Sequence, residues 1–230
     1  MDVAIIGGTG AEGFGLTLRL AKAGHHITIG SRDAGRAAAK AEEARGILGA
    51  DAQVSGAENP AAAAAAPVVI VTVPFEGAAA IYESIAGSVT PETVVCDCTS
   101  PLMASVGGRP SHALHPWHGS AAEFVRTLLP HGTRLVAGFH TVSAGVLRAL
   151  DRSVDSDTFV MGEDAEAKAA IGSLADDIDG MRWVDLGGLQ MARIAEQMTP
   201  LLISVNIRYK LHDAGFRMTG RDPWGSPAQG

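Results

Sequence analysis

Short apolar runs alternate along most of the chain with segments whose apolar residues recur at helical spacing. The runs that we expect to form strands are residues 3–6, 26–29, 68–73, 93–98, 135–139, 158–161 and 183–186. We expect helices at residues 13–22, 34–45, from 59 onward, 77–85, 120–129, 143–150 and 165–178. This alternation predicts an α/β fold in which helices cover both faces of a parallel sheet.

The pattern changes after Gly187 and Gly188. Residues 191–198 and 200–211 predict two consecutive helices, which Thr199 and Pro200 separate, because proline removes a backbone donor. We therefore expect residues 1–187 to form a doubly wound, Rossmann-type domain with a parallel sheet. Residues 188–230 would form a small C-terminal helical region.

Composition excludes several classes of partner. The chain has 18 lysines and arginines against 25 aspartates and glutamates, so no basic stripe is available for nucleic acid or an anionic membrane. No apolar stretch approaches the ~20 residues that span a bilayer. Cys96 and Cys98 lie in an apolar run and lack the further ligands of a zinc site, so we expect buried thiols of a cytoplasmic protein.

A glycine-rich motif follows the first expected strand and opens the first helix. It has the GxGxxG spacing and consists of Gly8, Thr9, Gly10, Ala11, Glu12 and Gly13. In this context the glycines permit a tight turn, close approach to a pyrophosphate and packing of helix on strand, while the helix start attracts phosphate. The motif predicts a dinucleotide site; the alternative is a glycine-rich turn without a ligand.

The end of the second expected strand favours NADP over NAD. NAD enzymes usually place a carboxylate there to bind the ribose 2′-hydroxyl group. This chain instead has Ser31 and Arg32, with Arg36 four residues further on. Hydroxyl and guanidinium groups suit a 2′-phosphate, and Asp33 can serve as a helix cap. Arg36 could also be a solvated helix charge. We expect residues 1–187 to be an NADP-binding domain.

The remaining candidate residues follow later strands, because ligands of open α/β sheets lie beyond the carboxyl ends of strands. Pro74-Phe75, residues 99–102 and His140-Thr141 occupy such positions. Among the histidines, His140 is the candidate general acid at a strand end. His112, His115 and His118 recur every three residues and suggest either a metal site or a surface loop. Without a carboxylate or cysteine in that stretch, we expect no metal.

Several motifs together resemble the NADPH-dependent reductases of the deazaflavin coenzyme F420. They begin with residues 6–10, Gly30-Ser31-Arg32 and 72–75, and continue with 119–123, 138–144 and 162–164. Residues 178–180 and 198–202, with Asn206 and 208–210, are the most specific of them. The resemblance covers essentially the whole chain. Ser143 departs from it, since some relatives have proline there.

The resemblance implies hydride transfer between nicotinamide C4 and deazaflavin C5, by stacking and orienting the two rings without acid–base machinery. It implies that residues 9–12 hold the pyrophosphate and that Ser31, Arg32 and Arg36 hold the 2′-phosphate. His140 would hydrogen-bond the deazaflavin. The rest of the NADP site would be lined by Phe75, Ala79, Leu102 and Ala144. A homodimer is also implied, and the apolar C-terminal helices would suit its interface.

Two other interpretations remain at this point. The protein could be an NADP-dependent reductase of another acceptor, such as a flavin, a ferric chelate or an imine. It could also be a non-catalytic redox sensor that binds NADP and a partner protein. Candidates for the anionic tail of the deazaflavin are Arg109, Arg126 and Arg134, and no spacing argument separates them.

Overall fold

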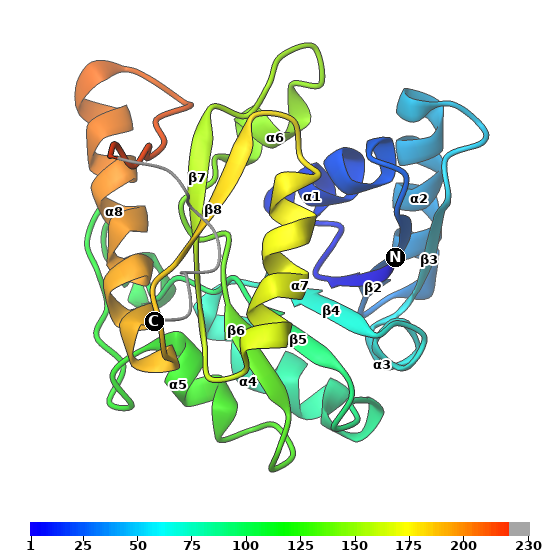
Figure 1. The fold of residues 1–230 in the computed structure, drawn as a ribbon, viewed down its shortest axis with the longest axis horizontal. Coiled ribbons are helices and arrows are strands. Elements are labelled where there is room, and N and C mark those ends of the chain that lie inside the picture. The colour runs from blue at the N-terminus through cyan, green and yellow to red at the C-terminus, as the bar shows by residue number, and fades with distance from the viewer. Residues whose placement is uncertain (221–230) are drawn as a thin grey trace.

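The computed structural model describes residues 1–220 and has an eight-stranded sheet in the order β3-β2-β1-β4-β5-β6-β7-β8 (Figure 1). The strands are β1 (Asp2–Ile6), β2 (His26–Ser31), β3 (Val54–Glu58), β4 (Val68–Val71), β5 (Val94–Asp97), β6 (Arg134–Ala137), β7 (Ser156–Gly162) and β8 (Met181–Asp185). From β1 the chain first adds β2 and β3 on one side of β1 and then continues with β4 on the other side. This change of side confirms the doubly wound fold.

The α-helices cover both faces of this sheet. They are α1 (Ala11–Lys22), α2 (Ala34–Leu48), α3 (Asn59–Ala64), α4 (Phe75–Ile85), α5 (Ala121–Arg126), α6 (Ala144–Arg148), α7 (Ala165–Asp176) and α8 (Ala192–Tyr209). In Figure 1, α8 lies at the opposite end of the molecule from α2. Among the described residues, no helix is both long and apolar enough to cross a membrane.

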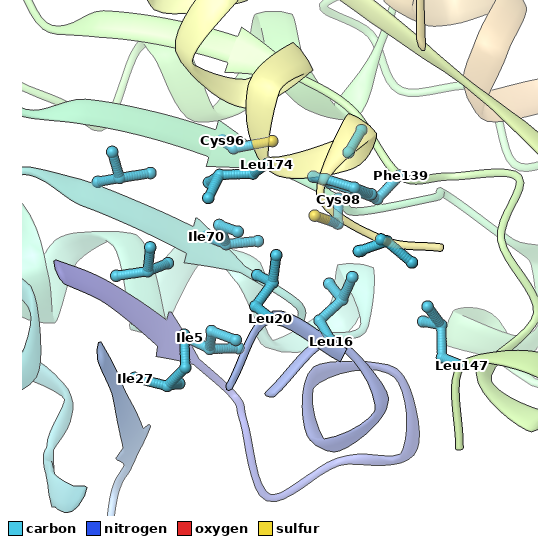
Figure 2. Close-up of a cluster of buried hydrophobic side chains, with 14 of the residues drawn as sticks. Ile5, Leu16, Leu20, Ile27, Ile70, Cys96, Cys98, Phe139, Leu147 and Leu174 are labelled. Atoms are coloured by element: carbon cyan, nitrogen blue, oxygen red, sulfur yellow. The ribbon is translucent and has the colours of Figure 1, made fainter. Parts of the chain in front are cut away.

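Alternation along each central strand sends side chains into two separate cores. In β4, for example, Ile70 belongs to the core beneath α1, α2, α6 and α7, whereas Val69 and Val71 belong to the core beneath α3, α4, α5 and α8. Figure 2 shows part of the first core, including Leu16 and Leu174. Because both faces are covered, these strands are continuous apolar runs.

Cys96 and Cys98 lie in the first core as free thiols, which confirms that they are buried (Figure 2).

Two features of the sheet differ from the sequence prediction. The edge strand β3 was not expected, because it contains only one large apolar residue, Val54, which is also its only fully buried one. An edge strand is paired on one side only and is less deeply buried than a central strand, so its apolar signature is weak. The sheet is also not entirely parallel, since β6 pairs with β7 in antiparallel orientation through Val136 and Ala137.

The two helices expected at residues 191–198 and 200–211 are one continuous helix, so that prediction was wrong. Pro200 lies inside α8, which ends where Lys210 adopts a left-handed conformation with φ of 56°. Ala195, before the proline, packs into the second core, and Leu202, after it, is buried as well. Burial on both sides of Pro200 holds the helix together despite the missing hydrogen bond. The boundary between residues 187 and 188 stays a prediction, and residues 221–230 lie outside the described residues.

Candidate cofactor site and a buried acid cluster

A cleft of about 480 Å³ lies at the carboxyl ends of β1, β2 and β4. It runs from the glycine-rich turn along the exposed side of α4. Of the residues predicted from the sequence, it is lined by Thr9, Gly10, Ser31, Arg32, Arg36 and Pro74. The structure therefore brings the two parts of the predicted NADP site, which are about twenty residues apart in sequence, to one cavity.

The glycine-rich turn is shaped by close backbone contacts. Gly7, one position before the motif, has the positive φ of 77° that the tight turn requires, and not Gly8 as the motif suggested. A Cβ atom on Gly8 would lie 2.7 Å from the carbonyl oxygen of Ile5. At Gly13, a Cβ atom would collide with Thr72 and lie 2.8 Å from Cα of Gly8. Helix α1 thus packs directly on the turn, as expected.

The start of α1 is open to an anionic ligand. Gly10 is the N-cap in an extended conformation, and no side chain caps the helix. The first backbone N–H groups of a helix have no intrahelical partner, and the helix dipole adds positive potential there. A pyrophosphate group fits such an end without any lysine or arginine.

The other end of the cleft combines a hydroxyl group, two guanidinium groups and an amide. Ser31 is buried at the end of β2, and Arg32 and Arg36 are exposed. Asp33 caps α2 by accepting a hydrogen bond of 2.8 Å from the backbone nitrogen of Arg36, so the cap prediction is confirmed. Asn59, only 3% exposed, also lines the cleft, and its Oδ1 has no partner. The sequence suggested only a helix start at Asn59.

Besides Gly8, Ala11, Glu12 and Gly13 of the glycine-rich motif, four predicted cofactor-binding residues lie outside the lining of this cleft. Phe75 and Ala79 are on α4 beside lining residues, and the Phe75 ring packs edge-on against Phe124 at 5.9 Å. Leu102 pairs with Ala113 in an isolated bridge, and Ala144 is the first residue of α6. Their contacts with a cofactor stay a prediction.

His140 follows a strained turn after β6. Phe139 has a positive φ of 63°, which a residue with a large side chain rarely adopts. Its ring enters the first core, and its backbone nitrogen donates to Oγ1 of Thr158 at 2.8 Å. The next side chain, His140, is 6% exposed, and neither ring nitrogen has a hydrogen-bond partner. Burial lowers the pKa of this imidazole to about 4, so it is neutral at pH 7.

The structure surrounds His140 with carboxyl groups that the sequence did not reveal. One ligand atom each from Asp97, His140 and Glu196 lies within 4.8 Å of the others, and all three residues are buried. Burial raises the pKa of Asp97 to about 6, although hydrogen bonds from Thr99 and Tyr82 act in the opposite direction. Burial and the nearby charge of Asp97 raise the pKa of Glu12 to about 8.

Glu196 joins α8 to α5. Its two carboxyl oxygens accept hydrogen bonds from the backbone nitrogens of Ala121, at 2.8 Å, and Ala122, at 3.1 Å. Burial nevertheless raises the pKa of Glu196 to about 8. One turn later, Thr199 donates to the carbonyl oxygen of His140 at 2.8 Å and shares a hydrogen bond with Ser100. Helix α8 is therefore tied to the loops after β5 and β6.

The histidine-rich loop does not form a comparable group. His112, His115 and His118 are all exposed. Within residues 1–220 they do not belong to any cluster of three ligands close enough to share a metal ion. The His118 ring instead packs on Phe124 at 5.1 Å.

Comparison with known proteins identifies the family. The family model described as NADP oxidoreductase, coenzyme F420-dependent, matches residues 2–101. An F420-dependent NADP reductase of Methanothermobacter thermautotrophicus is 43% identical over 95% of both chains. Another, from Methanocaldococcus jannaschii, is 41% identical over 95% of this chain and 98% of its own. The chain belongs to the F420-dependent NADP reductase family.

Solved structures agree with this family and with the fold. A crystal structure described provisionally as an F420-dependent NADP reductase from Arthrobacter sp. FB24 matches with a TM-score of 0.80 and 26% identity, over 96% of this chain and all of that one. An imine reductase from Streptomyces aurantiacus matches with a TM-score of 0.58 and 19% identity, over 89% of this chain and 61% of its own. The second likeness concerns the fold alone.

Proposed function

We propose that this protein transfers a hydride between NADP(H) and coenzyme F420, from nicotinamide C4 to deazaflavin C5 or in reverse. The family supports both substrates. The observation that carries the NADP half is the single cleft that joins the open start of α1 to Ser31, Arg32 and Arg36. The exposed guanidinium groups suit the doubly charged 2′-phosphate, which NAD lacks.

Different residues along the cleft bind different parts of the nucleotide. Gly8, Gly10 and Gly13 keep the turn free of side chains, and the backbone of Thr9, Ala11 and Glu12 faces the pyrophosphate. The face of α4 around Gly77 and Ala80 offers an apolar wall for the adenine. Phe75, Ala79, Leu102 and Ala144 lie further along the strand ends and complete the nicotinamide side. These assignments rest on the position of each residue and on the family resemblance.

His140 marks where we place the meeting point of the two rings. Both substrates carry hydride themselves, so the protein mainly orients them within contact distance. The imidazole is neutral, and its free nitrogens allow it to donate to or accept from the deazaflavin. The strained backbone at Phe139, which directs His140 away from the first core, supports a functional position.

The decisive experiment follows the absorbance of oxidised coenzyme F420 with NADPH and, in parallel, with NADH. Rapid loss of absorbance with NADPH and little with NADH is the expected result. Equal rates with NADH would contradict the assignment of Ser31, Arg32 and Arg36 to the 2′-phosphate, but the protein would still be a reductase of coenzyme F420. Tight NADP binding without reduction of coenzyme F420 would point to another acceptor, such as an imine or a flavin, or to a redox sensor.

We further propose that the protein is a homodimer that pairs through α8. This helix exposes large apolar side chains, of which Ile194, Leu201 and Tyr209 fall on one side of the helix, while Ile207 is exposed on another. Exposed apolar stripes of this kind mark association surfaces. Light scattering coupled to size exclusion should give twice the 23.6 kDa chain mass, and Leu201→Glu should give the monomer. A monomeric wild-type protein at micromolar concentration would contradict the proposal.

We also propose a cytoplasmic location, which is supported by the two free cysteines, since oxidising compartments favour disulfides. Fractionation of the source cells with an antibody against the chain tests this location.

A further inference from the structure

Hydride transfer alone leaves the buried acid cluster without a role. The cluster consists of Asp97 at the end of β5, His140 after β6 and Glu196 on α8, which lie close together. The partly buried Glu12 on α1 is near enough to Asp97 to feel its charge and is counted with them. These four elements meet at the carboxyl ends of the central strands, where ligands of this fold bind. A core position for so many carboxyl groups costs stability unless they are neutralised.

The cluster has no basic partner in the described residues. No lysine or arginine of residues 1–220 forms an ion pair with Glu12, Asp97 or Glu196. The other titratable groups facing them are themselves acidic, namely Tyr82 from α4, Cys98 next to β5 and Glu123 from α5. His140 is neutral at pH 7. Protons or a bound cation must therefore relieve the negative charge.

Protons fit the cluster better than a metal ion. A metal-binding histidine almost always donates its second ring nitrogen to an orienting partner, and His140 has none. Both oxygens of Glu196 already accept backbone hydrogen bonds. In Asp97, Oδ1 accepts from Tyr82 and Thr99 while Oδ2 has no partner, and Oε1 of Glu12 has none either. Such free oxygens can hold protons.

We propose that Glu12, Asp97 and Glu196 share a proton store that empties when the adjacent nicotinamide becomes positively charged. This inference rests on the proposed function, and it adds the source of the proton that hydride transfer requires. With NADPH bound, the ring is neutral and the cluster keeps its protons. With NADP⁺ bound, the positive ring favours an additional carboxylate. The three carboxyl groups titrate as one coupled unit.

The proton balances the reaction. When the nicotinamide C4–H bond breaks, its electron pair forms the deazaflavin C5–H bond, so one ring becomes positive and the other negative. A carboxyl O–H of the cluster then breaks and protonates one nitrogen of His140, while the opposite nitrogen releases its proton to a ring nitrogen of the deazaflavin. His140 ends neutral. The new carboxylate faces the positive nicotinamide, and both products are charge-compensated.

Calorimetry tests the store without coenzyme F420. Binding of NADP⁺ and of NADPH is measured at pH 7 in Hepes and in Tris, whose ionisation enthalpies differ, so that the protons released per site can be calculated. Both nucleotides carry the same 2′-phosphate, and protons lost from that group cancel in the difference. NADP⁺ should release more protons than NADPH. Equal release by the two nucleotides would overturn the proposal.

Variants locate the excess protons. The double variant Glu12→Gln/Glu196→Gln should lose most of the excess, and Glu12→Gln alone should lose part of it. The single variant removes no hydrogen bond at Oε1, so it should fold if the double variant does not. Glu123→Gln, a partly exposed carboxyl group facing Glu196, should retain all of the excess. An undiminished excess in Glu12→Gln and in any folded double variant would overturn the proposal.

Two further results separate this inference from its alternatives. Stoichiometric Zn²⁺ binding to the wild-type protein that is lost in Asp97→Asn would overturn it, because a cation would then neutralise the cluster. If the protein fails to reduce coenzyme F420 but NADP⁺ binding still releases more protons than NADPH binding, the proposed acceptor is wrong and the proton store stands. If the protein reduces coenzyme F420 but the two nucleotides release equal numbers of protons, the proton store is wrong and the proposed acceptor stands.

Discussion

The phenol of Tyr82 donates a hydrogen bond of 2.7 Å to Oδ1 of Asp97, and both side chains are completely buried. Thr99 donates to the same oxygen at 2.7 Å. One carboxyl oxygen of Asp97 is therefore fixed by two donors, whereas the other has no partner. This arrangement anchors the acid in place and leaves it one position that can hold or release a proton.

Replacing Tyr82 by phenylalanine should disturb that anchor in a defined direction. Its hydrogen bond lowers the pKa of Asp97 against the effect of burial, so Tyr82→Phe should raise this pKa above about 6. The lost buried hydrogen bond should cost about 1–3 kcal/mol of unfolding free energy. Urea unfolding and carbon NMR titration of the aspartates measure the two effects. Tyr209→Phe, which lies outside the acid cluster and keeps the apolar ring of the proposed dimer surface, is the control and should change neither. A lower pKa of Asp97 in Tyr82→Phe would contradict this prediction.

The two arginines at the end of the cleft should determine the choice of nucleotide. Arg32→Ala and Arg36→Ala should each raise KM for NADPH about tenfold or more, since a hydrogen bond to a charged group contributes ~1.5–3 kcal/mol. KM for NADH should stay nearly unchanged because NADH has no 2′-phosphate. Arg148→Ala, an exposed arginine on α6, is the matched control. Equal losses with both nucleotides would mean that the arginines support the fold and not the 2′-phosphate.

Only glycine fits at position 13, because a side chain there would collide with neighbouring atoms. A glycine with open space around its Cα provides the comparison. Gly13→Ala should push α1 away from the turn and weaken NADP binding by at least about tenfold, because the neighbouring atoms include the backbone of Gly7 and Gly8. A Cβ atom on Gly46, in α2, would meet nothing within 4 Å. Gly46→Ala should therefore raise stability by about 0.5–1 kcal/mol. Fluorescence titration with NADPH and thermal unfolding check the pair. Normal nucleotide affinity in Gly13→Ala would contradict this prediction, because it would show that the turn can move to accommodate the added methyl group.

The glycine-rich turn could be predicted because its signal is local. Gly8, Gly10 and Gly13 follow an apolar strand at fixed spacing, and the same holds for Ser31 and Arg32 after the next strand. Helix α8 was misjudged for a related reason. Pro200 is a strong local signal, but burial of the residues around it, which depends on the tertiary structure, prevailed.

The acid cluster depends on residues that are far apart in sequence. Glu12 was predicted only as part of the pyrophosphate-binding turn, and Glu196, on a helix far along the chain, was not singled out. One signal was available: Asp97 stands inside an otherwise apolar strand, where an ionisable group requires a partner. That requirement reveals a buried polar site but does not identify its other members. The other members, Glu12, His140 and Glu196, can be found only from the tertiary structure.

The raised pKa values of Glu12 and Glu196 should make the ligand-free protein less stable as the pH rises. Both values are about 8 in the folded protein, against a reference of 4.5. Between these limits the folded state binds protons that the unfolded chain has lost. The unfolding free energy then falls with increasing pH, by up to about 1.4 kcal/mol per pH unit for each such proton. Below about pH 4.5 the two states are equally protonated at these sites, and this contribution is constant.

Acids whose pKa is lowered in the folded protein titrate at lower pH than Glu12 and Glu196. The effect of the two raised pKa values on stability can therefore be measured separately. A hydrogen bond from Arg134 lowers the pKa of Asp164 to about 2, and its contribution is lost only below about pH 4. Urea unfolding of the ligand-free protein at pH 5.5 and 8.5 should therefore report the buried cluster. Stability should be higher at pH 5.5, and Glu12→Gln should reduce the difference while Glu43→Gln, on the exposed side of α2, leaves it intact. Equal stability at both pH values would mean that water reaches the cluster and that its carboxyl groups are not desolvated.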